Sequence, residues 1–255
     1  AVTFSGEMTW GRLWGAGLST IRRTPICLVP REDLETWSAL ASEEKGGPEP
    51  GRTAREVHEA LARGGAMFLQ ELMRATDFSR SLVEEGLSEL IGLGRASCDS
   101  FGGLRWLIVP AFRRRMGDLP AGRWSVLRRE TTSPPASGSA AEFVARRLLT
   151  RTGVVFRKTL EREKQPLPWR EIARACRRLE VRGEIRGGRF VAGFDGEQYA
   201  LPEAITLLRE VRRRSGSEPN PSPLVVSAVD PLNFRGILTP DERVAPSVRK
   251  QVRVA

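Results

Sequence analysis

The feature that most constrains the fold is a weak internal repeat, in which an apolar helical pattern that ends at a glycine occurs twice. The two endings, residues 90–94 and 179–183, can be laid over each other. Each is followed by two adjacent glycines, at 102–103 or at 187–188. A glycine just past a periodic apolar segment is a common helix end, and a glycine pair between short apolar stretches favours a β-hairpin. The repeat predicts two similar units, and it is a stronger indication than either half alone.

Residues 53–110 hold the first copy, in which three helices precede a hairpin. Thr53 is the expected N-cap of the first helix, with Glu56 as its capping-box partner. The remaining elements are expected as two helices and two strands, at 69–75, 81–93, 95–98 and 104–109. Three helices followed by a hairpin form the winged-helix arrangement.

The second copy, residues 140–214, repeats this order. Its helices and its hairpin are expected at 140–150, 157–163, 168–181 and 184–191, with a further helix at 201–214. Pro168 suits the first turn of its helix, because a missing N–H costs nothing there. Strand-like stretches occur in a β-rich segment at residues 1–40 and again at 222–255, outside both copies. The expected fold class is therefore α+β, with two winged-helix units.

The positive charge of the chain is concentrated in one region. The 255 residues carry a net charge of +10, but residues 113–214 hold 24 Lys and Arg against 12 Asp and Glu, while the remainder holds 17 against 19. Such an asymmetry indicates a polyanion as partner. A GC-rich genome is the alternative explanation, since only four of the basic residues are lysines. That bias explains the choice of arginine over lysine, and it leaves the regional excess unexplained.

The third helix of the second copy separates its side chains into two faces. Its apolar face is expected to comprise Trp169, Ile172, Ala173, Cys176 and Leu179. The opposite face and the wing together offer seven candidate DNA-binding residues: Arg170, Arg174, Arg177, Arg178, Arg182, Arg186 and Arg189. Guanidinium groups bind phosphate oxygens bidentately, and a winged-helix unit lays its third helix in or across a DNA groove. The alternative is a solvated helix face that Glu171 and Glu180 balance.

The third helix of the first copy has the opposite charge. It carries Glu84, Glu85 and Glu89, and its only arginine is the leading Arg80. An acidic helix is poorly suited to reading DNA. The first copy is therefore expected to be a packing or subunit-contact module.

Several classes of function lack the residues that they need. The chain has no G-x-x-x-x-G-K-[ST] phosphate loop, so it cannot itself be an ATP-driven motor. Three scattered cysteines and the single His58 predict no disulfide framework, no metal site and no catalytic triad. The scattered cysteines favour a reducing cytoplasm as the location. No apolar run reaches the ~18–20 residues of a membrane span.

Few other residues are candidates for chemistry. Asp195 and Asp230 are weak candidates for a catalytic acid, and a turn or cap role is the simpler interpretation of both. The run at 113–115 is either a phosphate clamp or a solvated loop.

The segment RRLEVRGEIRGGRFVAGF at 177–194, with shorter segments at 10–13, 24–26, 122–125, 141–149, 153–157, 168–171, 196–202 and 230–233, resembles the carboxy-terminal region of the large helicase-related (Lhr) proteins. The resemblance covers nearly the whole chain and is densest from 140 to 240. Lhr proteins are superfamily-2 DNA helicases linked to DNA repair. The resemblance implies a DNA-binding and assembly module without the motor, which would hold ATP and Mg²⁺ elsewhere in the parent protein. No cofactor or metal is expected in this chain.

The resemblance also implies structure and partners beyond the winged helices. Residues 1–40 and 222–255 would contribute strands to a small β-barrel-like module, incomplete at its last hairpin, and the protein would form a homo-oligomer. DNA is the expected partner, with the choice between single strands and duplex left open. Because the same region is similar to winged-helix DNA glycosylases, base excision is one alternative function. A tandem winged-helix transcription regulator is the other.

Overall fold

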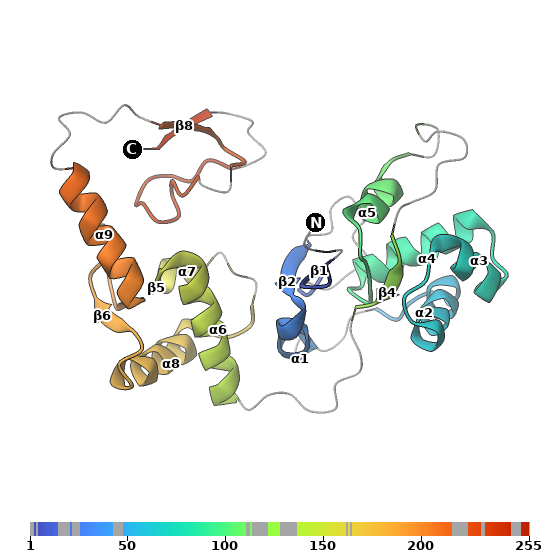
Figure 1. Ribbon diagram of the computed structural model, residues 1–255, viewed down its shortest axis with the longest axis horizontal. Coiled ribbons are helices and arrows are strands. Elements are labelled where there is room, and N and C mark those ends of the chain that lie inside the picture. Colours follow the sequence, from blue (N-terminus) through green and yellow to red (C-terminus); the bar gives the residue numbers. More distant parts are fainter. Residues whose placement is uncertain are drawn as a thin grey trace. The chain divides into compact units, whose positions relative to one another are not determined.

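The chain folds into two compact units, Ala1–Pro135 and Ala136–Ala255, each of which mixes helices with small sheets (Figure 1). The computed structural model describes residues 3, 5–14, 21, 26–42, 48–110, 113, 122–127, 137–161, 163, 165–215, 224–230, 233–245 and 251–254. The mixed helix-and-sheet class expected from the sequence is confirmed.

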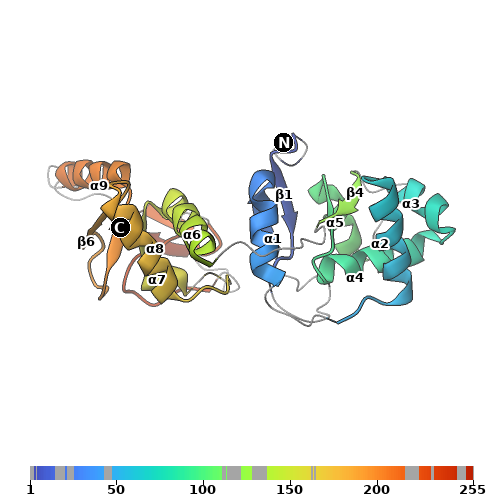
Figure 2. The same ribbon diagram turned by 90° about the horizontal axis from the view of Figure 1, so that it is seen from below.

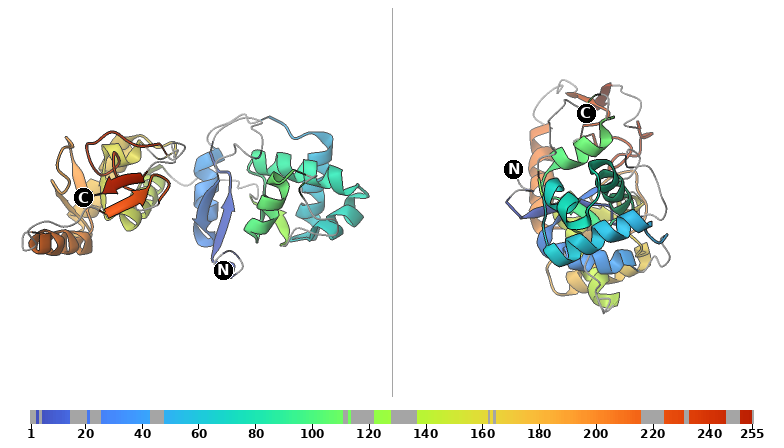
Figure 3. Two further views of the ribbon diagram at one scale, coloured as in Figure 1. Left: turned by 90° about the horizontal axis from the view of Figure 1, so that it is seen from above. Right: turned by 90° about the vertical axis from the view of Figure 1, so that its right-hand side faces the viewer.

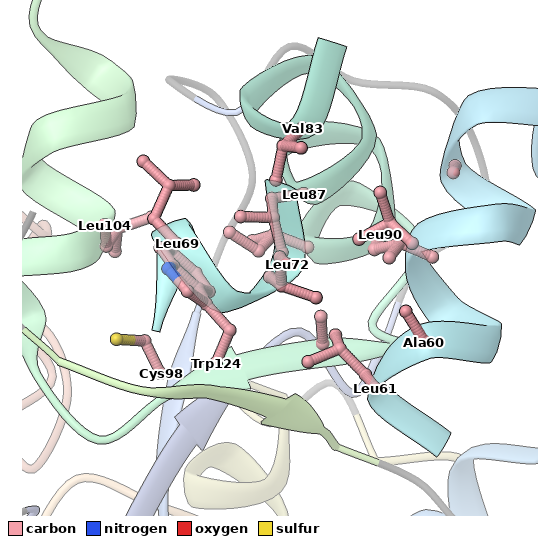
Figure 4. Packing of buried hydrophobic residues seen from close by; sticks show 14 of the residues in the cluster. Ala60, Leu61, Leu69, Leu72, Val83, Leu87, Leu90, Cys98, Leu104 and Trp124 are labelled. Carbon is pink, nitrogen blue, oxygen red and sulfur yellow. The ribbon is translucent and has the colours of Figure 1, made fainter. Parts of the chain in front are cut away.

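Unit 1 is built around three helices, with a strand pair on either side of them in the sequence. Its elements are β1 (Met8–Gly11), β2 (Cys27–Pro30), η2 (Arg31–Asp33), α1 (Leu34–Ser42), α2 (Arg52–Gly64), α3 (Leu69–Thr76), α4 (Arg80–Gly92), β3 (Ala96–Cys98), α5 (Phe101–Ile108) and β4 (Trp124–Val126). Leucines of α2, α3 and α4 converge on the fully buried Trp124 of β4 (Figure 4). These helices form because their apolar residues recur every three to four positions, which places them on the side facing this core.

Unit 2 repeats that order of three helices and paired strands. Its elements are α6 (Ser137–Thr152), β5 (Val154–Phe156), α7 (Arg157–Leu160), α8 (Trp169–Val181), β6 (Arg186–Gly188), β7 (Gln198–Ala200), α9 (Pro202–Ser215), β8 (Leu224–Ser227) and β9 (Gln251–Val254). Strands β5, β7 and β6 form one antiparallel sheet in that order. Figure 2 shows α6, α7 and α8 grouped together beside β6.

The helix ends show the internal repeat directly. Gly94 after α4 and Gly183 after α8 both have a left-handed backbone, with φ of 67° and 78°. In both caps the next N–H donates to the carbonyl of a leucine near the helix end, from Arg95 to Leu90 at 2.8 Å and from Glu184 to Leu179 at 3.0 Å. Glycine adopts this conformation without strain, so both third helices end in the same way.

The prediction of a hairpin at the end of unit 1 is wrong. Residues Phe101–Ile108 form helix α5, and β3 pairs with the distant β4 instead. Ser100 starts α5 by accepting a hydrogen bond from the N–H of Gly102 at 2.9 Å. A Cβ added to Gly103 would lie 2.8 Å from the Sγ of Cys98 and 2.9 Å from the ring of Trp124. The glycine pair therefore allows a helix to approach β3 and β4 closely, and it is not a turn.

The wing of unit 2 also differs from its prediction. The adjacent glycines at 187–188 lie inside β6, where Gly187 pairs with Tyr199, so residues 189–197 form the tip between β6 and β7. A Cβ on Gly187 would lie 2.7 Å from a carboxylate oxygen of Glu180. Here too, glycine is needed for a close approach rather than for a turn.

The start of unit 1 differs from the sequence in two details. Gly51 rather than Thr53 precedes α2, with no side-chain cap, and Glu56 pairs with Arg52 at 2.9 Å. The segment expected to be β-rich also contains α1, because Leu34 and Trp37 recur at helical spacing and pack against a small apolar cluster.

A barrel made from both chain ends is not confirmed. Among the described residues, β1 pairs with β2 in unit 1 and β8 pairs with β9 in unit 2 (red in Figure 3), and no sheet closes on itself. Strand β1 and the residue that follows it are joined to β3 and α4 of the same unit instead. The Oγ of Ser97 donates to the carbonyl of Trp10 at 2.5 Å, and the guanidinium of the buried Arg12 donates to the carbonyl of Gly92 at 2.6 Å.

Candidate nucleic-acid interface

Helix α8 is held by one apolar face and leaves the other face in solvent. Pro168 occupies the N-cap position with extended backbone, one residue before the helix begins. The buried residues of α8 are Ile172, Ala173, Ala175, Cys176 and Leu179. They pack against α6, so the orientation of the opposite face is fixed by the core of unit 2.

All seven arginines predicted as DNA-binding residues are exposed. The side chains of four of them make no hydrogen bond or ion pair with any residue that the structure describes; they are those of Arg170, Arg174, Arg186 and Arg189. Two of these four lie on the outward face of α8 and two on the wing. The structure therefore brings the predicted residues to the surface of one winged-helix unit.

The other three arginines have partners within unit 2. Arg177 forms an ion pair with Glu197 at 2.6 Å, and Arg182 pairs with Glu142 at 2.5 Å and with Glu184 at 2.7 Å. Arg178 donates to a backbone carbonyl at the start of α6, at 3.3 Å. The sequence predicts seven equivalent arginines. In the structure, three of their side chains have partners within unit 2, and four have none among the described residues.

The pairs around Arg182 form a small network at the end of α8. Arg146 of α6 also contacts both carboxylates, Glu184 at 2.6 Å and Glu142 at 3.0 Å. The hydrogen bond from Arg182 lowers the pKa of Glu142 below its usual value, and the hydrogen bond from Arg146 does the same to the pKa of Glu184. Both carboxylates are therefore anionic at neutral pH, and they reduce the net positive charge at this end of the helix.

The wing is attached directly to α8. The N–H of Gly187 donates to the side chain of Glu180 at 2.8 Å, which joins strand β6 to the last turn of the helix. In the alternative interpretation of the sequence, Glu180 balances the positive charge of the helix surface. In the structure its carboxylate accepts a hydrogen bond from a backbone N–H of the wing. This bond fixes the position of strand β6 relative to the last turn of α8.

The corresponding helix of unit 1 has its charges reversed. In the alignment of the two glycine caps, Glu85 and Glu89 take the places of Arg174 and Arg178. Glu89 accepts a hydrogen bond from the N–H of Gly51 at 2.7 Å, at the start of α2, which is where Arg178 donates in unit 2. This acidic helix presents carboxylates where α8 presents guanidinium groups.

Helix α5 covers part of the same acidic helix. Glu84 accepts from the indole N–H of Trp106 at 2.9 Å and from Arg80 at 2.9 Å, and the Arg80 guanidinium lies 4.8 Å from the centre of the Trp106 ring. Glu84 is therefore engaged inside unit 1.

The two weak catalytic candidates lie in turns. Asp195 is exposed in the wing loop between two glycines with positive φ. Asp230 follows β8, where its N–H donates to Ser227 at 2.9 Å and its carbonyl accepts from Asn233 at 2.9 Å. The structure does not bring the two carboxylates together with a nucleophile or base among the described residues.

The remaining candidates do not add a reactive site. Burial raises the pKa of the Cys98 thiol and that of the Cys176 thiol to about 12, so both stay protonated at neutral pH. No group of three or more potential metal ligands occurs among the described residues. Of the run at 113–115, residues 114 and 115 lie outside the part of the chain that the structure describes.

One residue that the sequence analysis does not single out is central to the wing. Gln198 is buried in β7 and forms four hydrogen bonds with the backbone of the wing loop. Its only signal in the sequence is a polar residue next to Tyr199 in a short strand. That signal is too common to identify a role.

Fold and interface together define a winged-helix protein whose second unit carries a basic outward helix. Residues 134–220 match the sequence family described as the winged-helix domain of large helicase-related protein. The Lhr helicase/uracil glycosylase of Escherichia coli (strain K12) is 33% identical over 212 residues, which cover 71% of this chain and 14% of that protein. Residues 134–220 thus belong to the Lhr family, and the resemblance identified in the sequence is confirmed.

A second relative agrees with the first. The Lhr helicase/probable uracil glycosylase of Mycolicibacterium smegmatis (strain ATCC 700084 / mc(2)155) is 28% identical over 209 residues, or 72% of this chain and 14% of that protein. The chain thus spans 14% of the length of each of these relatives. No described helix is long and apolar enough to cross a membrane.

Proposed function

We propose that unit 2 binds DNA through its phosphates, as a module without a motor of its own in an Lhr-type DNA repair helicase. The observation that carries this proposal is the set of four exposed arginines on α8 and the wing that have no partner in the described chain. Guanidinium groups held on a rigid helix are suited to phosphate oxygens, and each contact releases condensed counterions. DNA is the expected partner and the cytoplasm the expected location, and ATP and Mg²⁺ would belong to the motor of the parent protein.

The alternative of a solvated, self-balanced helix accounts for only part of this face. Arg177 does pair with Glu197, but this pair is exposed, with 57% of the arginine side chain and 45% of the glutamate side chain accessible. An isolated exposed ion pair contributes only about 0–1 kcal/mol, so a phosphate can displace the carboxylate of Glu197 at little cost. Arg182 shares two carboxylates with Arg146 and is not counted among the phosphate contacts.

Unit 1 is proposed to serve packing and assembly rather than DNA contact. The reversed charges at Glu85 and Glu89 would repel phosphates, and Glu84 is engaged with α5. Formation of a homo-oligomer and completion of a barrel-like module remain predictions from the resemblance. Light scattering of the purified chain measures the first of these directly.

The salt dependence of DNA binding tests the proposed function. With four phosphate contacts, the logarithm of the association constant should fall against the logarithm of salt concentration with a slope of about −3.6, since each contact contributes about −0.9 on duplex DNA. Duplexes of unrelated sequence should bind with similar affinity. A slope close to zero would exclude phosphate binding, and one sequence bound ~10³-fold more tightly would favour the transcription-regulator alternative.

Base excision is the weaker candidate. It is favoured by the names of the two relatives, both of which include uracil glycosylase. A glycosylase needs a residue that activates water beside a flipped-out base, whereas Asp195 and Asp230 lie in turns. We expect DNA that contains uracil to be bound by this chain without formation of abasic sites. Alkali-labile cleavage above that of a no-protein control would reverse the order of the two candidates.

A further inference from the structure

Gln198 is a buried polar side chain that organises a surface loop. It is 1% exposed, and its Oε1 accepts hydrogen bonds from the N–H groups of Phe190 and Val191, both at 2.8 Å. Its Nε2 donates to the carbonyls of Val191 at 2.9 Å and Phe194 at 3.3 Å. A single side chain thus replaces the ladder hydrogen bonds that the wing loop, residues 189–197, lacks.

Two apolar contacts hold the same loop from other directions. The ring of Phe194 lies 4.6 Å from that of Phe156, centre to centre. A Cβ on Gly193, where φ is 80°, would lie 2.9 Å from the Cγ of Pro240, so the loop also fits closely against the segment that follows β8. The loop is therefore fixed on its inner side, while Arg189 at its start is exposed.

We infer that Gln198 is a positioning residue for DNA binding, which holds the wing loop in the conformation that keeps Arg189 beside the arginines of α8. This inference rests on the proposed function of unit 2. Ordering a free loop on binding costs conformational entropy. A loop that is already ordered does not bear this cost on binding, so its cation contributes more to affinity.

Replacement of Gln198 with methionine tests the inference. Methionine has a similar length and no hydrogen-bonding amide, so Gln198→Met removes the four bonds with little change in volume. In the whole chain we expect about tenfold weaker binding to duplex DNA and faster hydrogen exchange at the N–H groups of Phe190 and Val191. Affinity within twofold of the wild type, together with faster exchange at these groups, would overturn the inference.

A double-mutant cycle separates positioning from general destabilisation. If Gln198 acts through Arg189, Gln198→Met should cost less than about twofold in an Arg189→Ala background, because the group that it positions is gone. In an Arg170→Ala background the full tenfold loss should remain, since Arg170 lies on α8. An equal loss in both backgrounds would show a merely structural role and would overturn the inference.

Gly193→Ala provides a second variant should Gln198→Met fail to fold. The added methyl disturbs the loop from the side of Pro240 and leaves the buried β7 intact. We expect weaker DNA binding that again depends on Arg189, and unchanged affinity in the folded variant would overturn the inference.

Failure of the proposed function looks different, because affinity would then be unaffected by the loss of Arg170 and Arg174 as well.

Discussion

Replacing Arg170 and Arg174 together with alanine is expected to weaken binding of the chain to duplex DNA about a hundredfold at low salt. Both side chains lie on the exposed face of α8 and have no partner among the described residues, so they can bind phosphate without breaking an existing contact. A hydrogen bond to a charged group contributes about 1.5–3 kcal/mol, and 1.4 kcal/mol is a factor of ten in affinity. Fluorescence anisotropy over a range of salt concentrations measures both the affinity and its slope.

The dependence of affinity on salt concentration makes this prediction specific for phosphate contacts. Loss of two phosphate contacts should make the slope shallower by about two, equally for all DNA sequences. The matched control is the double replacement of Arg52 and Arg55, two exposed arginines of α2 in unit 1, which removes the same charge from the chain. If both double variants weaken binding to the same extent, net charge rather than the α8 face governs the interaction.

The paired arginines explain why sequence alone overstates the uniformity of this face. A helical wheel places Arg170 and Arg177 on one side of α8, and the structure agrees that both are exposed. The helical wheel cannot show that Glu197, twenty residues later in the sequence, accepts a hydrogen bond from Arg177. Contacts between residues distant in sequence depend on the tertiary fold, and charge patterning within one helix carries no information about them.

The sequence predicts the buried face and the end of a helix where one local rule determines each of them. The spacing of Ile172, Cys176 and Leu179 predicts the buried face of α8, and the glycine caps at 94 and 183 predict where the third helices end. Both features follow from local backbone geometry and periodicity.

The paired glycines do not identify a turn, because glycine has two uses. It permits positive φ in turns, and it also permits close approach of neighbouring groups. At Gly103 the neighbours are Cys98 and Trp124, and at Gly187 the neighbour is Glu180. Only the packed structure distinguishes the second use from the first, so the sequence could not reveal helix α5 or the true tip of the wing.

Replacing Arg12 with methionine is expected to lower the free energy of unfolding of unit 1 by about 2–4 kcal/mol. The side chain is 6% exposed, and it donates to the carbonyl of Gly92 at 2.6 Å and to that of Trp14 at 3.2 Å. Gly92 is the last residue of α4, where a cation also opposes the negative end of the helix dipole. Methionine would leave these carbonyls without a donor, and each buried unsatisfied group costs about 1–3 kcal/mol.

Arg31 offers a matched control for this prediction, because its guanidinium also donates to a backbone carbonyl, that of Gly6 at 2.9 Å, but at an exposed position. Water replaces the lost donor there, so Arg31→Met should change the unfolding free energy by less than about 0.5 kcal/mol. Arg12→Lys should fall between the two, since an ammonium keeps the charge at the end of α4 but cannot span both carbonyls. Urea denaturation followed by tryptophan fluorescence measures all three. If Arg12→Met and Arg31→Met are equally stable, the buried hydrogen bonds of Arg12 do not contribute to the stability of unit 1 as predicted.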